Sequence, residues 1–78
     1  MVADLVEDLA RRLVDEPDAV RVERVDEGDE LVLRLHVAQG DRGKVIGRQG
    51  RIARALRTVV RASAAQEQRR VRLEIVDD

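Results

Sequence analysis

The chain has 78 residues, no cysteine and no aromatic residue, and its 15 basic and 16 acidic side chains give a formal net charge of -1. A chain this short forms one small domain, and without cysteine it can hold neither disulfides nor thiolate metal sites, which favours a reducing compartment. No apolar run is long enough to span a bilayer, and the first residues carry acids where a signal peptide would carry bases. We therefore expect a single domain over residues 1–78, in the cytoplasm and without a membrane partner.

The first half of the chain predicts one helix and two strands. Apolar residues recur at three- and four-residue intervals over positions 2–15, which indicates an amphipathic helix that stops before Pro17. Alternating apolar residues at 20–25 predict a short strand, and the glycine-containing segment 26–30 is typical of a turn. Strict alternation over 31–37 predicts a second strand, with its leucines on a buried face and the intervening residues on the other face.

The second half predicts two helices and a strand. Asp41 can cap a brief helix that runs through Ile46, and a longer helix follows Gly50 and reaches about Gln66. Alternation over 71–75 predicts the last strand. The element order is therefore α-β-β-α-α-β.

The small net charge hides a strong segregation along the chain. Residues 1–30 contain eleven acids and four bases, whereas residues 31–78 contain eleven bases and five acids. Between Arg42 and Arg61 there are seven bases and no acid. We therefore expect one electropositive face on a molecule that is nearly neutral as a whole.

The inventory of reactive side chains favours binding over catalysis. The chain has one serine (Ser63), one threonine (Thr58) and one histidine (His36), and no pattern pairs a nucleophile with a base or clusters carboxylates. His36 is expected to be exposed on the face opposite the leucines, and a lone histidine without cysteine does not make a metal site. We therefore expect no enzyme activity, no catalytic residue, no metal and no cofactor.

Glycines at positions 40, 43, 47 and 50 precede the longer helix, and their spacing can be compared with that of phosphate-binding motifs. A dinucleotide fingerprint needs G-x-G, which the chain lacks. A Walker A loop needs four residues before Gly-Lys and then serine or threonine, whereas here two residues separate Gly40 from Gly43, and Val45 follows Lys44. Nucleoside triphosphate chemistry is therefore not expected.

The segment from Gly47 to Gly50 joins the brief helix to the longer one. Without Cβ atoms at its ends it can turn sharply and let a sugar-phosphate chain approach, while the first amides of the long helix offer partial positive charge. We expect Arg48 and Gln49 to face the ligand, because Ile46 and Ile52 anchor the segment in the core. Cations for successive phosphates would come from Lys44, Arg48, Arg51 and Arg54.

The sequence GKVIGRQG, residues 43–50, is similar to the loop of KH domains. The longer stretch over residues 40–65 resembles the KhpA-like family of small bacterial single-KH proteins. The similarity covers nearly the whole chain and includes the N-terminal helix and hairpin of the bacterial, type II arrangement. It implies an α+β KH domain in which a three-stranded sheet packs on three helices.

The resemblance also implies binding of single-stranded RNA, because a KH loop clamps about four nucleotides by their backbone. The family's motif falls on Ile46 and residues 47–50, and the bases would lie in an aliphatic groove beside residues 71–76. Without an aromatic residue for stacking, we expect weak binding of broad specificity, roughly micromolar, and a chaperone-like role in RNA metabolism. The residues expected to bind RNA are Lys44, Ile46, Gly47, Arg48, Gln49, Gly50, Arg51, Ile52 and Arg54.

The rest of the long helix leaves other interpretations open. Arg57 and Arg61 lie nearly opposite its apolar stripe, so we expect them to be solvated or to face a partner. The alternative function is a protein-interaction or dimerisation module that acts with a larger KH protein of the KhpB/Jag type. A homodimer is expected because small domains gain stability from a partner chain, and alanines would let a second helix approach. These alanines are Ala55, Ala62, Ala64 and Ala65.

Overall fold

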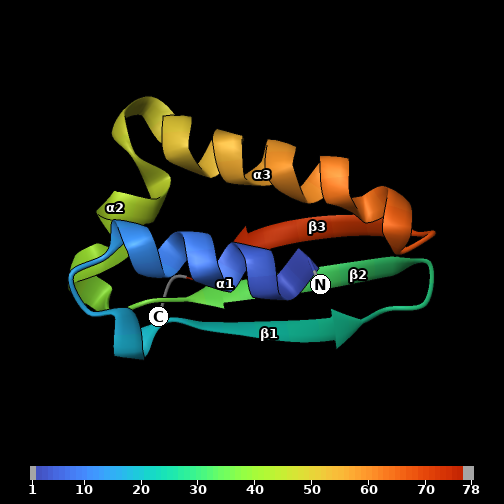
Figure 1. Cartoon of the computed structure of the whole chain (residues 1–78), viewed down its shortest axis with the longest axis horizontal. Coiled ribbons are helices and arrows are strands. Elements are labelled where there is room, and N and C mark those ends of the chain that lie inside the picture. The colour runs from blue at the N-terminus through green and yellow to red at the C-terminus, as the bar shows by residue number, and fades with distance from the viewer. Residues whose placement is uncertain (1, 77–78) are drawn as a thin grey trace.

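Residues 2–76 are described by a computed structural model, in which three helices lie against one side of a three-stranded sheet (Figure 1). The order of these elements confirms the predicted α-β-β-α-α-β arrangement. Short 3-10 turns join several of them, and the expected last turn of the long helix, Ala64–Gln66, is one of these. The helices and strands are α1 (Val2–Leu13), β1 (Arg21–Asp26), β2 (Glu30–His36), α2 (Arg42–Ile46), α3 (Arg51–Ser63) and β3 (Arg70–Ile75).

The sheet has the order β1-β2-β3, with β2 antiparallel to β1 and parallel to β3. A parallel pair needs a crossover connection, and here α2 and α3 form that crossover between β2 and β3. Leu31, Leu33 and Leu35 of β2 are almost completely buried, as their alternation predicts. β2 therefore forms the centre of the core, and β3 is left as an edge strand beside α3.

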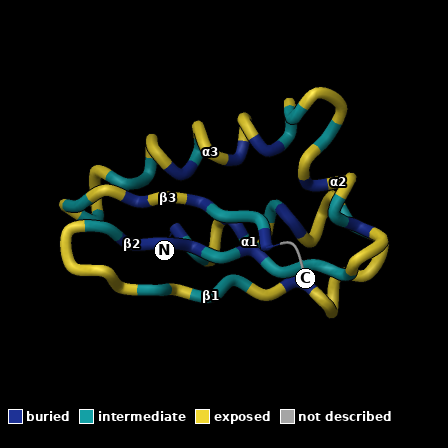
Figure 2. Tube along the Cα trace, turned by 180° about the vertical axis from the view of Figure 1, so that it is seen from behind, coloured by how far each residue is buried: buried dark blue, intermediate teal, exposed yellow. Residues whose placement is uncertain are grey.

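The core lies between the sheet and the inner faces of α1 and α3, where Figure 2 shows the buried positions of these helices. In α1 the buried line is Val2, Val6 and Ala10, at four-residue intervals. Leu5 and Leu13, which belong to the same apolar stripe in the sequence, stay 39% and 37% exposed. Residues spaced four apart cover a narrower part of the helix surface than the apolar stripe does, so α1 leaves some of its large apolar residues partly exposed.

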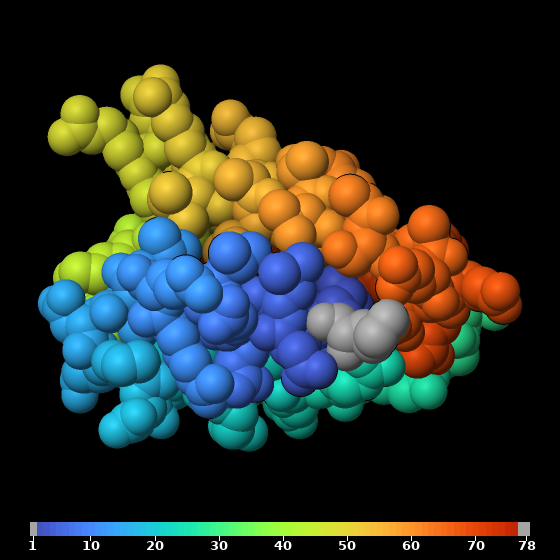
Figure 3. Space-filling view, viewed as in Figure 1, coloured from blue at the N-terminus to red at the C-terminus, as the bar shows by residue number. Residues whose placement is uncertain are grey.

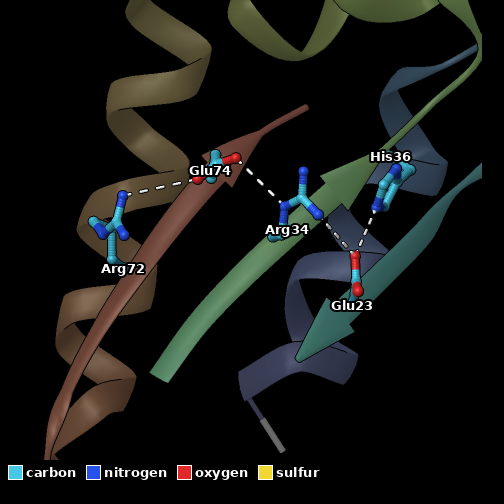
Figure 4. Close-up of polar contacts among 5 residues, drawn as sticks. All are labelled: Glu23, Arg34, His36, Arg72 and Glu74. Atoms are coloured by element: carbon cyan, nitrogen blue, oxygen red, sulfur yellow. Dashed lines mark hydrogen bonds and ion pairs between the residues drawn. The ribbon is translucent and has the colours of Figure 1, made fainter. Parts of the chain in front are cut away.

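The sheet face away from the helices carries paired charges (Figure 4). Arg34 of β2 lies between two acids, with Nη1 3.3 Å from Glu23 Oε1 and Nε 3.4 Å from Glu74 Oε1. His36 is on this face as expected but is not exposed: its side chain is 14% accessible, and Nε2 lies 3.3 Å from the same Glu23 oxygen. Because its charges neutralise one another, this face is a poor surface for a polyanion.

Candidate nucleic-acid interface

The loop between α2 and α3 projects from the molecule and is largely exposed (Figures 2 and 3). Gly47 ends α2 with φ 77° and ψ 171°, and its N–H donates to Gly43 O at 2.8 Å. Gln49 and Gly50 follow with φ 58° and 74°, and Gly50 N–H donates to Gly47 O at 3.1 Å. Three left-handed residues within four positions reverse the chain in one tight 3-10 turn.

The two glycines of this loop have different reasons to be glycine. A Cβ on Gly47 would lie 2.9 Å from both Cβ and the backbone N of Ile52, and closer still to Ile52 Cγ1. Its φ and ψ also fall in a region that is almost restricted to glycine. A Cβ on Gly50 would meet nothing within 4 Å. Close packing on Ile52 therefore requires Gly47, whereas open space beside Gly50 leaves room for a ligand.

Polar side chains surround the first turn of α3. Arg48, Gln49, Arg51 and Arg54 are all exposed, and Arg51 Nη2 donates to Gln49 Oε1 at 3.3 Å. The N-cap of α3 is Gly50, which has no side chain to cap the helix, and the first amide of the helix, Arg51 N–H, donates to Arg48 O. The structure thus brings four of the predicted contact side chains together around the start of this helix.

The two isoleucines beside the loop have different environments, and the expectation that both anchor it in the core is wrong for one of them. Ile52 packs against the core, but Ile46 is 41% exposed. Adjacent helical residues point about 100° apart, and in the five-residue α2 the inward position is taken by Val45, which is fully buried. Ile46 is therefore free to form part of an apolar surface.

This apolar surface belongs to three adjoining hollows between the helices and β3. The α2 hollow, about 420 Å³, and the central hollow, about 550 Å³, share Ile46 and Ile75 in their walls. The central hollow and a distal hollow of about 640 Å³ share Arg57 and Arg61. The three hollows adjoin one another along α3 and β3, beginning beside the loop at Gly50, and are called the groove below. The α2 hollow is lined by Gln39, Arg42, Gly43, Ile46, Ile75 and Val76, and the central hollow by Ile46, Gly50, Ala53, Arg54, Arg57, Arg61 and Ile75.

Lys44, another predicted contact, points to the segment after α1 instead of the groove. Its Nζ lies 3.1 Å from Asp15 Oδ2 and 3.6 Å from Asp41 Oδ1. The hydrogen bond and the charge of Asp15 raise the pKa of Lys44 above its usual value. Lys44 therefore shares its charge with two acids, unlike the exposed arginines around the loop.

The sequence predicts that Asp41 caps α2, but its side chain makes no capping hydrogen bond. It joins two distant segments of the chain instead. It is 3% exposed, and its carboxylate accepts the backbone N–H groups of Asp15 at 3.2 Å and Glu16 at 3.0 Å. Burial alone would raise the pKa of Asp41, but these hydrogen bonds and the Lys44 ammonium outweigh it and lower the pKa. The segment that follows α1 is thereby fixed to the start of α2.

We predict that Asp41→Ala lowers Tm by roughly 5–15 °C, because it leaves two amides without their acceptor. Since the folded-state pKa is lowered, this stabilisation is complete above the unfolded pKa of about 3.9 and is lost as the pH falls through the folded value. Thermal melts of both proteins at about pH 6 and about pH 3 test this. The Tm difference should shrink at the lower pH, and an equal difference at both would contradict the role of the ionised carboxylate.

Comparison with known proteins places this chain in a family. The model of the KhpA/KhpB KH domain matches residues 3–75. The chain belongs to this KH family. It is 56% identical over 73 residues to the RNA-binding protein KhpA of Halalkalibacterium halodurans, covering 94% of this chain and 96% of that one. It is 46% identical over 74 residues to the KhpA of Bacillus subtilis, covering 95% and 91% of the two chains.

Solved structures confirm the KH fold independently. The chain superposes with a TM-score of 0.63 on Aquifex aeolicus Era bound to GDP and AlF4-, at 22% identity. A second Era structure, in complex with MgGDPNP and nucleotides 1506–1542 of 16S ribosomal RNA, gives the same TM-score at 21% identity. Each match covers 95% of this chain but only 29% and 28% of the Era chains, so this chain corresponds to less than a third of Era.

The sequence predicts that Arg57 and Arg61 are solvated or face a partner. Both are exposed, as predicted, but they also line the central and distal hollows, which the sequence did not predict. They follow Arg54 at intervals of three and four residues. This spacing indicates that the three arginines share one side of α3. The helix sequence by itself does not show that β3 lies beside that side.

Over residues 2–76, no helix is long and apolar enough to cross a membrane. The same part of the chain contains no group of three or more histidine or acidic side chains placed to hold a metal ion.

Proposed function

We propose that this KH domain binds single-stranded RNA of varied sequence, with the 47–50 loop on the sugar-phosphate backbone and the bases in the groove. The observation that carries this proposal is an exposed, acid-free loop that opens into an apolar groove edged by arginines. Curated relatives named as RNA-binding proteins, at about half identity over nearly the full chain, support it. A cytoplasmic location and a chaperone-like role in RNA metabolism fit such broad binding.

The residues of the loop have separate roles in this proposal. Gly50, with open space around it, lets a phosphate approach the loop backbone at the start of α3. Arg48, Arg51 and Arg54 carry the charge that phosphates require, and arginine binds a phosphate with two parallel hydrogen bonds. Lys44 contributes less, because two acids already neutralise it.

The groove accounts for the bases. Ile46, Ile75 and Val76 give aliphatic contact in the α2 hollow. β3 is an edge strand, so the backbone groups on its outer side have no strand partner and can bond to base edges. The chain has no aromatic residue, so about 1 to 3 kcal/mol of stacking per base is absent. We expect dissociation constants that are roughly micromolar.

A salt titration with matched single-stranded and duplex RNA tests this function. With three or four phosphate contacts, the slope of log K against log salt should be roughly -2 to -3, since each contact contributes about -0.7 for single strands. The single strand should bind more tightly, because bases held in a duplex cannot enter the groove. A slope near zero, or equal affinity for duplex, would argue against the proposal.

Self-association is the second candidate, favoured by exposed apolar positions on the helices. The four alanines named from the sequence do not form one surface: Ala64 packs on the core and Ala65 lines the distal hollow. Ala55 and Ala62, seven residues apart, are exposed on one side of α3. We propose a homodimer through this side, which would present two weak RNA sites to one strand. A complex with a larger KhpB/Jag-type KH protein is the alternative use of this surface.

Light scattering at tens of micromolar tests the dimer. The wild-type protein should show twice the monomer mass of 8.8 kDa, and Ala62→Glu should restore the monomer mass. The control Ala19→Glu, at an exposed position outside α3, should leave the dimer intact. Monomer mass for the wild-type protein at every concentration would favour the heterologous partner.

A further inference from the structure

The distal hollow lies beyond the part of the groove that the loop reaches. It is bounded by the C-terminal half of α3, the following turn and the start of β3. Its volume of about 640 Å³ is in the range of ligand pockets. The apolar part of its wall comes from Val60, Ala64, Ala65, Val71 and Leu73. Such a wall suits a flat apolar group such as a nucleobase.

The rim of this hollow is strongly basic. Among the residues that the structure describes, five arginines line it, and the only acid in its wall is Glu30, which already pairs with Arg72 at 3.3 Å. Arg69 is held by Asp26 at 2.8 Å. The side chains of the other three, Arg57, Arg61 and Arg70, make no hydrogen bond or ion pair within the part of the chain that the structure describes. The hollow therefore offers unpaired guanidinium groups to an anion.

The hollow also adjoins the proposed RNA site. Arg57 and Arg61 line both the central and the distal hollow, so their side chains lie where a strand leaving the first would enter the second. A KH loop holds about four nucleotides, which would occupy the loop and the adjoining hollows. We propose that the distal hollow binds one or two further nucleotides of the same RNA strand, which extends the site beyond four nucleotides. This inference rests on the proposed function.

An acidic peptide could in principle use the same charges, but the arrangement favours RNA. Arg54, Arg57 and Arg61 follow one another along α3 from the loop to the distal hollow, and this row suits the regular charges of one continuous polyanion. An apolar wall along the same path suits the bases of that strand. A separate peptide bound in the distal hollow would not account for the row of arginines between this hollow and the loop.

The test is the dependence of affinity on RNA length. Labelled single strands of about 4, 6, 8 and 10 nucleotides are titrated with three proteins: the wild type, the distal variant Arg70→Glu/Ala65→Glu, whose two residues line the distal hollow and not the central one, and the control Arg21→Glu/Ala19→Glu. The control makes the same charge change at exposed positions outside the groove, and Ala19 also lies in a 3-10 turn. A longer strand can be bound at more positions, which raises its apparent affinity for every protein. Comparing the variants at the same RNA length removes this effect.

For the wild type and the control, affinity should rise about tenfold beyond four nucleotides and then level off, as expected for one added arginine–phosphate contact. The distal variant should bind the shortest strand like the control and lose this rise. A distal variant that keeps the full rise overturns the inference and leaves the hollow to an acidic peptide. Failure of the wild type to bind any of the strands would refute the proposed function itself.

Discussion

Replacing Arg48 and Gln49 together by Asp is expected to abolish measurable RNA binding while Tm changes by only a few degrees. Both side chains are exposed at the tip of the loop, and neither contributes to the core. Among residues 2–76, the only side-chain hydrogen bond lost is the exposed contact between Arg51 and Gln49. Two carboxylates would then face the phosphates, and like-charge repulsion replaces attraction at the place where the backbone is held.

The matched control for this variant is Arg21→Asp/Gln66→Asp. It removes the same side-chain types and adds the same charges at exposed positions outside the loop and the groove. Fluorescence anisotropy with a labelled single strand measures binding, and circular dichroism measures Tm. The control should bind within a few-fold of the wild type. A folded loop variant with unchanged affinity would show that the RNA lies elsewhere on the molecule.

Gly47→Ala is expected to have the largest effect of any single change in the loop. The new Cβ would clash with the backbone N of Ile52, and a backbone atom cannot rotate away as a side chain can. The backbone at this position is also almost forbidden to other residues, so the clash and the strain add. We expect a loss of about 2–4 kcal/mol in the free energy of unfolding, together with a loss of RNA affinity of at least tenfold.

Gly50→Ala is the control for this prediction, because it introduces backbone strain without a clash. Its φ of 74° and ψ of 17° are left-handed, so alanine costs about 1–2 kcal/mol of strain, but no atom lies in the way of its Cβ. Asn at this position should cost less, because asparagine tolerates this conformation. Urea unfolding of the three variants measures the difference. Equal destabilisation by alanine at both positions would mean that packing against Ile52 does not constrain the loop.

The fold could be predicted because its signals are local. The leucines of β2 alternate, the apolar residues of α3 recur with helical spacing, and the glycines mark the break between two helices. The role of Asp41 could not be predicted from such local signals. Its position before α2 fits a helix cap, but its partners are amides 25 and 26 residues earlier in the chain. No local pattern identifies such a partner.

The candidate site shows the same division between local and distant information. The loop residues were predicted from their spacing, whereas the place of Ile46 depended on Val45 taking the inward position of a very short helix. The sequence predicts Arg57 and Arg61 on the solvated side of α3, because helical spacing by itself distinguishes only an apolar side from a polar side. The neighbouring β3 turns the flank between these sides into the wall of a groove.

The measurement that tests the central claim most directly is an NMR titration of the isotope-labelled protein with a short single-stranded RNA. Amide shift changes should concentrate on residues 46–51 and on β3 near Ile75, where the loop and groove meet. The sheet face that carries Glu23, Arg34 and His36 should change little, because its charges are already paired. Shift changes confined to that face, with the loop unaffected, would contradict the proposed RNA site.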